Sequence, residues 1–172
     1  MITDAQLWLA DSVALGTVIT GTGDEDLSQV TNGHSYDRGP LHADNLTIAS
    51  MGEGETLYFF WMIRTGATAG GTINLKLVSD EGDPASAGLD SNSIVHAQSG
   101  ALAIATAAGT FGFEPLAPRG ITAAGVPAEW KRYIGILATV ATADVTGTAT
   151  LHAGITADVQ YIKQYASGLN FV

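Results

Sequence analysis

The segment Thr148–Gln160, TATLHAGITADVQ, decides the fold, because its apolar side chains recur at every second position. In an extended chain, alternate residues point to opposite faces. The apolar face comprises Leu151, Ala153, Ile155, Ala157 and Val159, and the second face Thr150, His152, Thr156 and Asp158. This segment therefore predicts a half-buried β-strand whose second face is wetter.

The same alternation recurs in residues 133–140 and 73–77. Leu57–Ile63 is apolar on both faces, as expected of a central strand that is covered on both sides. Gly, Asp, Asn or Pro interrupts the strands about every ten residues, which is typical of an antiparallel β-sandwich. Four residues are predicted to lie in its core: Leu75, Ile136, Leu151 and Ile155.

Helix is expected to be minor, limited to short turns at Pro127–Tyr133 and Val159–Ala166. Two polar, turn-rich stretches, Gly21–Asn45 and Ser79–Ser93, are predicted to be long loops. A chain of 172 residues is long enough for one self-sufficient core, so residues 1–172 are predicted to form a single domain.

The composition argues against several partners. Seven Lys and Arg against 17 Asp and Glu give a net charge of −10, which phosphates and anionic lipids would repel. Direct nucleic-acid or membrane binding is therefore not expected. The longest apolar run is too short for a membrane span, and the start of the chain lacks the basic region of a secretory signal. Only 14% of residues are charged, against about 25% in an average domain. A surface partly covered by a partner would explain this low fraction, and so would the many small residues, Ala, Gly and Thr.

Two acidic clusters are candidate calcium ligands, because hard cations prefer several carboxylates on a loop. They are Asp24, Glu25 and Asp26, and Asp80, Glu81 and Asp83. Neither cluster has the remaining ligands of an EF-hand, and with no cysteine a thiolate zinc site is excluded. No metal and no cofactor are predicted.

Catalytic signatures are also missing from the sequence. The four histidines lack any paired spacing, and the glycine-rich pieces at Gly21–Gly23 and Gly52–Gly54 do not meet a phosphate-binding fingerprint. His34, beside Ser35 and followed by Tyr36-Asp37-Arg38, is the polar cluster most like an active site, but adjacency in sequence is no evidence of triad geometry. The chain is predicted not to be an enzyme.

The three tryptophans could stack on sugars. Trp61 lies within a predicted strand, where packing in the core is the usual outcome. Trp8 and Trp130 are left open for glycan binding.

A series of motifs along most of the chain resembles the jelly-roll capsid cement (decoration) family of tailed bacteriophages, typified by the cement protein of a Bordetella podophage. The motifs are, in order, MITDAQL (Met1–Leu7), GEGE (Gly52–Glu55), TAGGTINLKL (Thr68–Leu77), AQSG (Ala97–Gly100), PRG (Pro118–Gly120), Tyr133-Ile134, TATLHAGITADVQ (Thr148–Gln160) and YASG (Tyr165–Gly168). Each motif is weak alone, and their order and spacing carry the resemblance. The chain departs from the family pattern at Gly21–Asn45 and Ile121–Trp130.

The resemblance implies a jelly-roll sandwich that binds the major capsid protein as a homotrimer on the outer surface of the virion head. It brings no cofactor and no reaction. Six residues are interface candidates, as apolar or aromatic pieces outside the main strands or at the Pro-Arg-Gly turn: Leu7, Trp8, Leu9, Arg119, Tyr161 and Tyr165. The alternatives are a β-sandwich domain of a head or tail fibre that binds host glycan, and a small hydrolase that uses His34.

Overall fold

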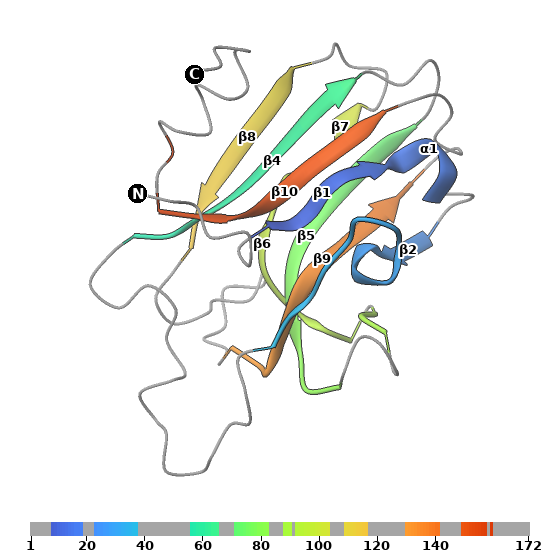
Figure 1. Cartoon of the computed structure of the whole chain (residues 1–172). Helices are drawn as coiled ribbons and strands as arrows, with labels where there is room; N and C mark the ends of the chain where they lie inside the picture. The colour runs from blue at the N-terminus through green and yellow to red at the C-terminus, as the bar shows by residue number, and fades with distance from the viewer. Residues whose placement is uncertain are drawn as a thin grey trace, which may run out of the picture.

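The described part of the chain is almost entirely β-structure (Figure 1). The computed structural model describes residues 8–18, 23–37, 56–65, 71–82, 88–90, 92–103, 109–116, 130–141, 149–157 and 159. Within them, helix is limited to α1 (Leu15–Val18), the 3₁₀ turn η2 (Leu27–Gln29) and the single residue Val159. The predicted all-β sandwich with minor helix is confirmed.

The first sheet, sheet A, has the strand order β1-β10-β4-β8, and every pair is antiparallel. Its strands are β1 (Trp8–Ala14), β10 (Thr150–Thr156), β4 (Tyr58–Thr65) and β8 (Thr110–Pro115). The apolar run at Leu57–Ile63 thus supplies an interior strand, β4, as its two-sided pattern predicts.

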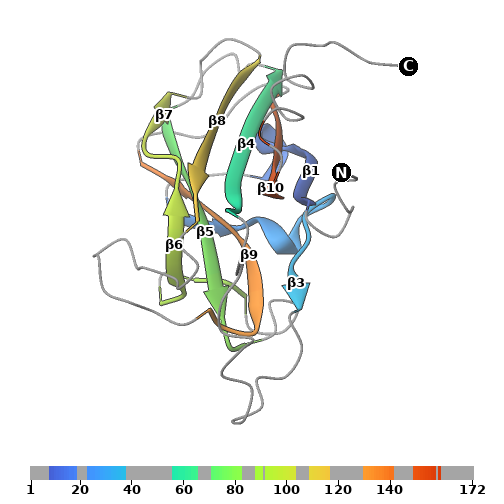
Figure 2. The same cartoon turned by 90° about the vertical axis from the view of Figure 1, so that its left-hand side faces the viewer.

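The second sheet, sheet B, has the strand order β2-β9-β5-β6. Its strands are β2 (Gly23–Asp26), β9 (Tyr133–Val140), β5 (Thr72–Asp80) and β6 (Ile94–Gln98), with β3 (Tyr36–Asp37) beside β9 and β7 (Leu102–Ala103) beside β5. Figure 2 shows the two sheets as facing layers.

One core lies between the sheets. Leu75, Ile136 and Leu151 are fully buried and Ile155 is 2% exposed, so the four predicted core residues are confirmed. Trp61 of β4 lies over Gly112 of β8, where any Cβ would collide with the indole ring. The core therefore fits a tryptophan by keeping its cross-strand neighbour free of a side chain.

The prediction of a wetter second face on β10 is wrong. His152 is 1% exposed and Thr156 is fully buried. Trp8 of β1 packs edge-on against both Phe60 and His152, so neighbouring strands help to cover this face. β9 is also buried on both faces, because Leu89 occupies the space above Gly135.

The expected long loop at Gly21–Asn45 needs correction, because it contains β2, η2 and β3. The acidic run GDED pairs with β9 as an edge strand, and Asp26 then caps η2 by accepting a hydrogen bond from the Ser28 amide at 2.8 Å. In the other stretch, Ser79 and Asp80 extend β5, and the described residues from 81 to 93 contain no strand.

The expected helical turn at Pro127–Tyr133 is not found in its described residues, since 130–132 are irregular and Tyr133 begins β9. Of the second expected turn, Val159–Ala166, only Val159 lies within the described residues, and it is helical. A search of the described residues finds no helix with the length and hydropathy of a bilayer span.

Candidate functional site

The outer face of sheet A carries a continuous set of large apolar side chains. Directly paired residues in an antiparallel sheet point to the same face, so the register defines this set. Phe60 pairs with Phe113, Met62 with Phe111, and Tyr58 with Pro115. We call the following residues the aromatic face: Trp8, Tyr58, Phe60, Met62, Phe111 and Phe113.

The rings of the aromatic face contact one another. Trp8 and Phe60 meet edge to face with centroids 5.1 Å apart, Tyr58 and Phe113 meet edge to face at 6.3 Å, and Phe111 stacks near Phe113 at 6.5 Å. Phe60 is almost fully buried, whereas Phe111 is 40% exposed. The face therefore has a covered centre near β10 and an accessible apolar edge at β8, where a partner could dock.

His152 lies at the β1 side of the aromatic face. Its Nδ1 is 3.2 Å from a carboxylate oxygen of Asp11, and its Nε2 is 3.3 Å from the hydroxyl of Ser12. Burial lowers the pKa of His152 below its ordinary value of 6.5; the carboxylate of Asp11 opposes this shift and the charge of Arg64 adds to it. The buried imidazole is therefore biased toward its neutral form.

Two of the six predicted interface residues are described. Trp8 belongs to the aromatic face, but Leu9 is 1% exposed and packs in the core, so its side chain is not available to a partner. Both residues belong to β1 and do not lie outside the main strands. A register shift between Trp8 and Ala10 makes Leu9 an extra residue, so Leu9 and Ala10 both pack in the core while Trp8 lies on the outer face. Leu7, Arg119, Tyr161 and Tyr165 lie outside the described residues.

Several of the acidic residues considered as metal ligands have protein partners. Asp80 accepts hydrogen bonds from the Gly82 amide and the Ser93 hydroxyl, and Glu81 lies 3.0 Å from Lys131 Nζ. Asp83 lies outside the described residues. Among those described, no group of three or more His, Asp or Glu could hold a metal ion, and the absence of a metal stays a prediction.

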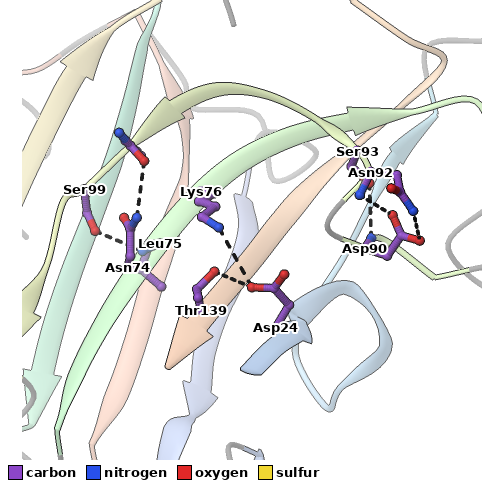
Figure 3. A network of polar contacts seen from close by, with 10 residues as sticks. Asp24, Asn74, Leu75, Lys76, Asp90, Asn92, Ser93, Ser99 and Thr139 are labelled. Carbon is purple, nitrogen blue, oxygen red and sulfur yellow. Dashed lines mark hydrogen bonds and ion pairs between the residues drawn. The ribbon is translucent and has the colours of Figure 1, made fainter. Parts of the chain in front are cut away.

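Polar contacts on sheet B hold strands and turns together (Figure 3). Asp24 of β2 accepts a hydrogen bond from Thr139 of β9 and lies 3.8 Å from Lys76 Nζ of β5. Ser99 accepts a hydrogen bond from the Leu75 amide at 2.9 Å. These contacts join strands of sheet B, so their evident role is structural.

In the described residues of the His34 cluster, the aspartate contacts an arginine of another segment. His34 and Ser35 are both exposed. Asp37 is held instead by Arg132, whose Nε and Nη2 donate to its two carboxylate oxygens at 2.9 and 2.8 Å. Arg38 lies outside the described residues.

Two tryptophans are removed from the candidates for sugar stacking. Trp61 and Trp130 are 7% and 1% exposed, and Trp130 stacks on His96 with centroids 3.6 Å apart. Trp130 is thus part of the core, contrary to the possibility left open from the sequence, and Trp8 is the tryptophan that retains a place near the surface.

Sequence reasoning missed the aromatic face and the contacts of His152. The alternation Phe111-Gly112-Phe113 and the two-sided apolar run of β4 are local signals for the former. The partners of His152 are 140 and 141 residues away, and no sequence signal joins them.

No protein-family model matches this chain, and a search of the curated proteins finds no significant match. Arguments about function therefore rest on the motifs and on this geometry.

Proposed function

We propose that this chain is a capsid decoration protein, which binds the outer surface of an icosahedral phage head as a homotrimer and stabilises it. The observation that carries the proposal is the ordered series of motifs shared with the cement family. Where these motifs lie in described residues, three fall on neighbouring strands of sheet B: TAGGTINLKL ends in β5, AQSG ends β6 and Tyr133-Ile134 opens β9. TATLHAGITADVQ contains β10, in sheet A.

The strand order supports a jelly roll, as the resemblance implies. If the short pairs β2 with β3 and β6 with β7 each count as one interrupted strand, eight strands remain. Renumbered along the chain, their orders are 1-8-3-6 in one sheet and 2-7-4-5 in the other. This alternation between the two sheets is what nested Greek keys produce.

One motif has a clear local role. In AQSG, the Ser99 amide donates to the carbonyl of Leu75 at 2.8 Å, and the Ser99 hydroxyl donates to the carbonyl of Gly100. Gly100 has a φ of 71°, which glycine adopts without strain. The motif thus fixes the end of β6 against β5, and its presence supports a shared architecture more than a shared binding site.

The aromatic face is our candidate for capsid attachment. Its exposed edge is apolar, and few residues of the chain are charged, so attachment should depend on apolar contacts with modest dependence on salt. A trimer would present three such surfaces at once, and binding to the intact lattice would oppose rupture of the head.

The test is co-sedimentation of the purified protein with phage heads that lack it. Wild type should sediment with the heads and raise the temperature at which they rupture, and light scattering should give about three times the mass of one chain. Phe111→Ser should weaken sedimentation, because it removes an exposed apolar contact. Gln98→Ala, on the outer face of sheet B, is the matched exposed control and should bind as wild type.

A monomer that neither sediments with heads nor protects them from heat would contradict the proposal. Retention on immobilised host polysaccharide, lost in Trp8→Ala, would then favour the fibre alternative, because an exposed aromatic ring can stack on a sugar.

A further inference from the structure

A bulge in β1 aims two successive side chains at one histidine. The register passes from Asp11 opposite His152 to Val13 opposite Leu151, so Ser12 is an extra residue. In a regular strand Asp11 and Ser12 would point to opposite faces. Here both reach the imidazole of His152, and re-aiming a side chain beside a reactive site is a recurrent use of bulges.

The two contacts use different nitrogens of the ring. The Ser12 hydroxyl lies 3.3 Å from Nε2, and an Asp11 carboxylate oxygen lies 3.2 Å from Nδ1. Hydroxyl, imidazole and carboxylate in this order are the arrangement that activates a serine nucleophile. We propose that Ser12 is a nucleophile that cleaves activated carboxylic esters, with His152 as its general base and Asp11 as a positioning residue.

The backbone at Ser12 supports this assignment. Its φ is 62°, in the left-handed region that residues with a Cβ rarely adopt. Ser12 and Asn32 are the non-glycine residues with positive φ in the described chain, and asparagine tolerates this region better than serine. A glycine would fit Ser12's position without strain, so a serine there is consistent with a need for its hydroxyl.

The surroundings suit the chemistry. The His152 side chain is 2% exposed, whereas that of Asp11 is 63% exposed and Ser12 is half-buried, so a small ester can approach the hydroxyl from the solvent side. Burial lowers the pKa of His152, which keeps the imidazole unprotonated and able to accept a proton near pH 7. Trp8 and Met62 flank the ring, which favours aryl or short acyl esters.

The reaction proceeds in two balanced halves. Ser12 Oγ attacks the ester carbonyl while its proton passes to His152 Nε2, and the tetrahedral intermediate expels the alcohol, which takes that proton. Water, which loses a proton to the same nitrogen, then attacks the acyl carbonyl. The bond from the acyl carbon to Ser12 Oγ breaks, Oγ takes the proton back from His152 Nε2, and the acid leaves. The Asp11 contact is close but imperfectly aligned for a hydrogen bond, and such contacts commonly tighten only when substrate binds.

This proposal departs from the expectation of a non-enzymatic protein, and it is independent of the capsid proposal. It also differs from the hydrolase alternative, which rests on His34 and Ser35.

The first test is covalent labelling of the full chain with a fluorophosphonate, from which Ser12 Oγ would displace fluoride. Peptide mass spectrometry should find the phosphonyl group on Ser12. Ser35→Ala, which alters an exposed serine beside a histidine, should label as wild type. Ser12→Gly should not label, and it should melt at the same or a higher temperature, because glycine relieves the positive φ.

The second test measures hydrolysis of p-nitrophenyl acetate. His152→Gln should reduce the Ser12-dependent rate about a hundredfold, the usual contribution of a general base. The wild-type rate should rise with pH through an inflection below 6.5. Asp11→Asn should lower the inflection further, a change that loss of a purely structural contact would not produce. An unlabelled Ser12 in folded protein, or an unchanged rate in Ser12→Gly, would overturn the proposal.

Discussion

The two outer faces of the sandwich are built from different chemistry. On sheet A, rings and a methionine surround a buried histidine, and apolar surface reaches solvent at Phe111. On sheet B, Asp24, Lys76 and Thr139 form a polar network, and Leu89 covers a patch that includes Leu137. In the described residues, several polar groups on the outer face of sheet B pair with one another, whereas sheet A leaves Phe111 exposed. Sheet A is therefore the better candidate for contact with a partner.

The largest effects should come from the core, which both sheets share. Leu75→Ala in sheet B and Leu151→Ala in sheet A should each lower the free energy of unfolding by about 2–5 kcal/mol, because both side chains are fully buried. Phe111→Ala should change it by less than about 0.5 kcal/mol, as for other exposed positions. Denaturant titration measures all three. A large loss from Phe111→Ala would mean that the edge of the aromatic face belongs to the core.

The next largest effect on stability should distinguish two aspartates on β2. Asp26 accepts hydrogen bonds from the amides of Ser28 and Leu89, so Asp26→Ala should lower the free energy of unfolding by about 1.5–3 kcal/mol. Asp24→Ala is the matched control and should lower it by less than about 1 kcal/mol, because its contacts are exposed. Thermal or chemical unfolding measures both variants. Equal losses of unfolding free energy would contradict the view that Asp26 holds Leu89 over sheet B.

A smaller effect tests the contact of Leu89 with sheet B directly. Gly135→Ala would place a Cβ against Leu89 and should lower the free energy of unfolding by about 1 kcal/mol, the lower end for overpacking, because segment 88–90 can shift. In a double-mutant cycle with Leu89→Ala, the added methyl should be tolerated, so the two losses should not add. Strict additivity would show that Leu89 does not press on Gly135.

The smallest expected effect is a pH dependence specific to sheet A. Burial lowers the pKa of His152 below 6.5, so the unfolded chain binds its proton more readily than the folded chain. Stability from this group is therefore complete above pH 6.5 and is lost as the pH falls through the lowered folded value. Melting temperatures between pH 5 and 8 should show this fall in wild type and less of it in His152→Gln. A steeper fall in the variant would contradict the sign.

Local alternation made much of the fold predictable from the sequence. β5, β9, β10 and their inward residues follow the period of two that a half-buried strand requires. The cover of the outer faces could not be predicted in the same way, because it depends on residues distant in sequence. Leu89 lies over Gly135, and Trp8 lies beside Phe60 and His152.

β1 was missed for a related reason. Its two register shifts, around Leu9 and Ser12, break the alternation that marks a strand, so Leu9 looked like a surface residue. The shift around Ser12 also brings Asp11 and Ser12 to the same histidine, His152. The proposed site at Ser12 therefore lies where the alternation of apolar and polar residues is interrupted, and only the pairing of β1 with β10 reveals it.

The bulges of β1 have one more consequence, which concerns self-association. A straight, unpaired strand edge is a template on which identical chains can stack into a growing sheet. Here β1 ends one side of sheet A with two irregularities, and the short strands β2 and β3 divide the border of sheet B, where β2 carries the acidic run GDED. Neither of these two borders offers a long regular ladder, so both oppose open-ended fibre growth when the protein is concentrated.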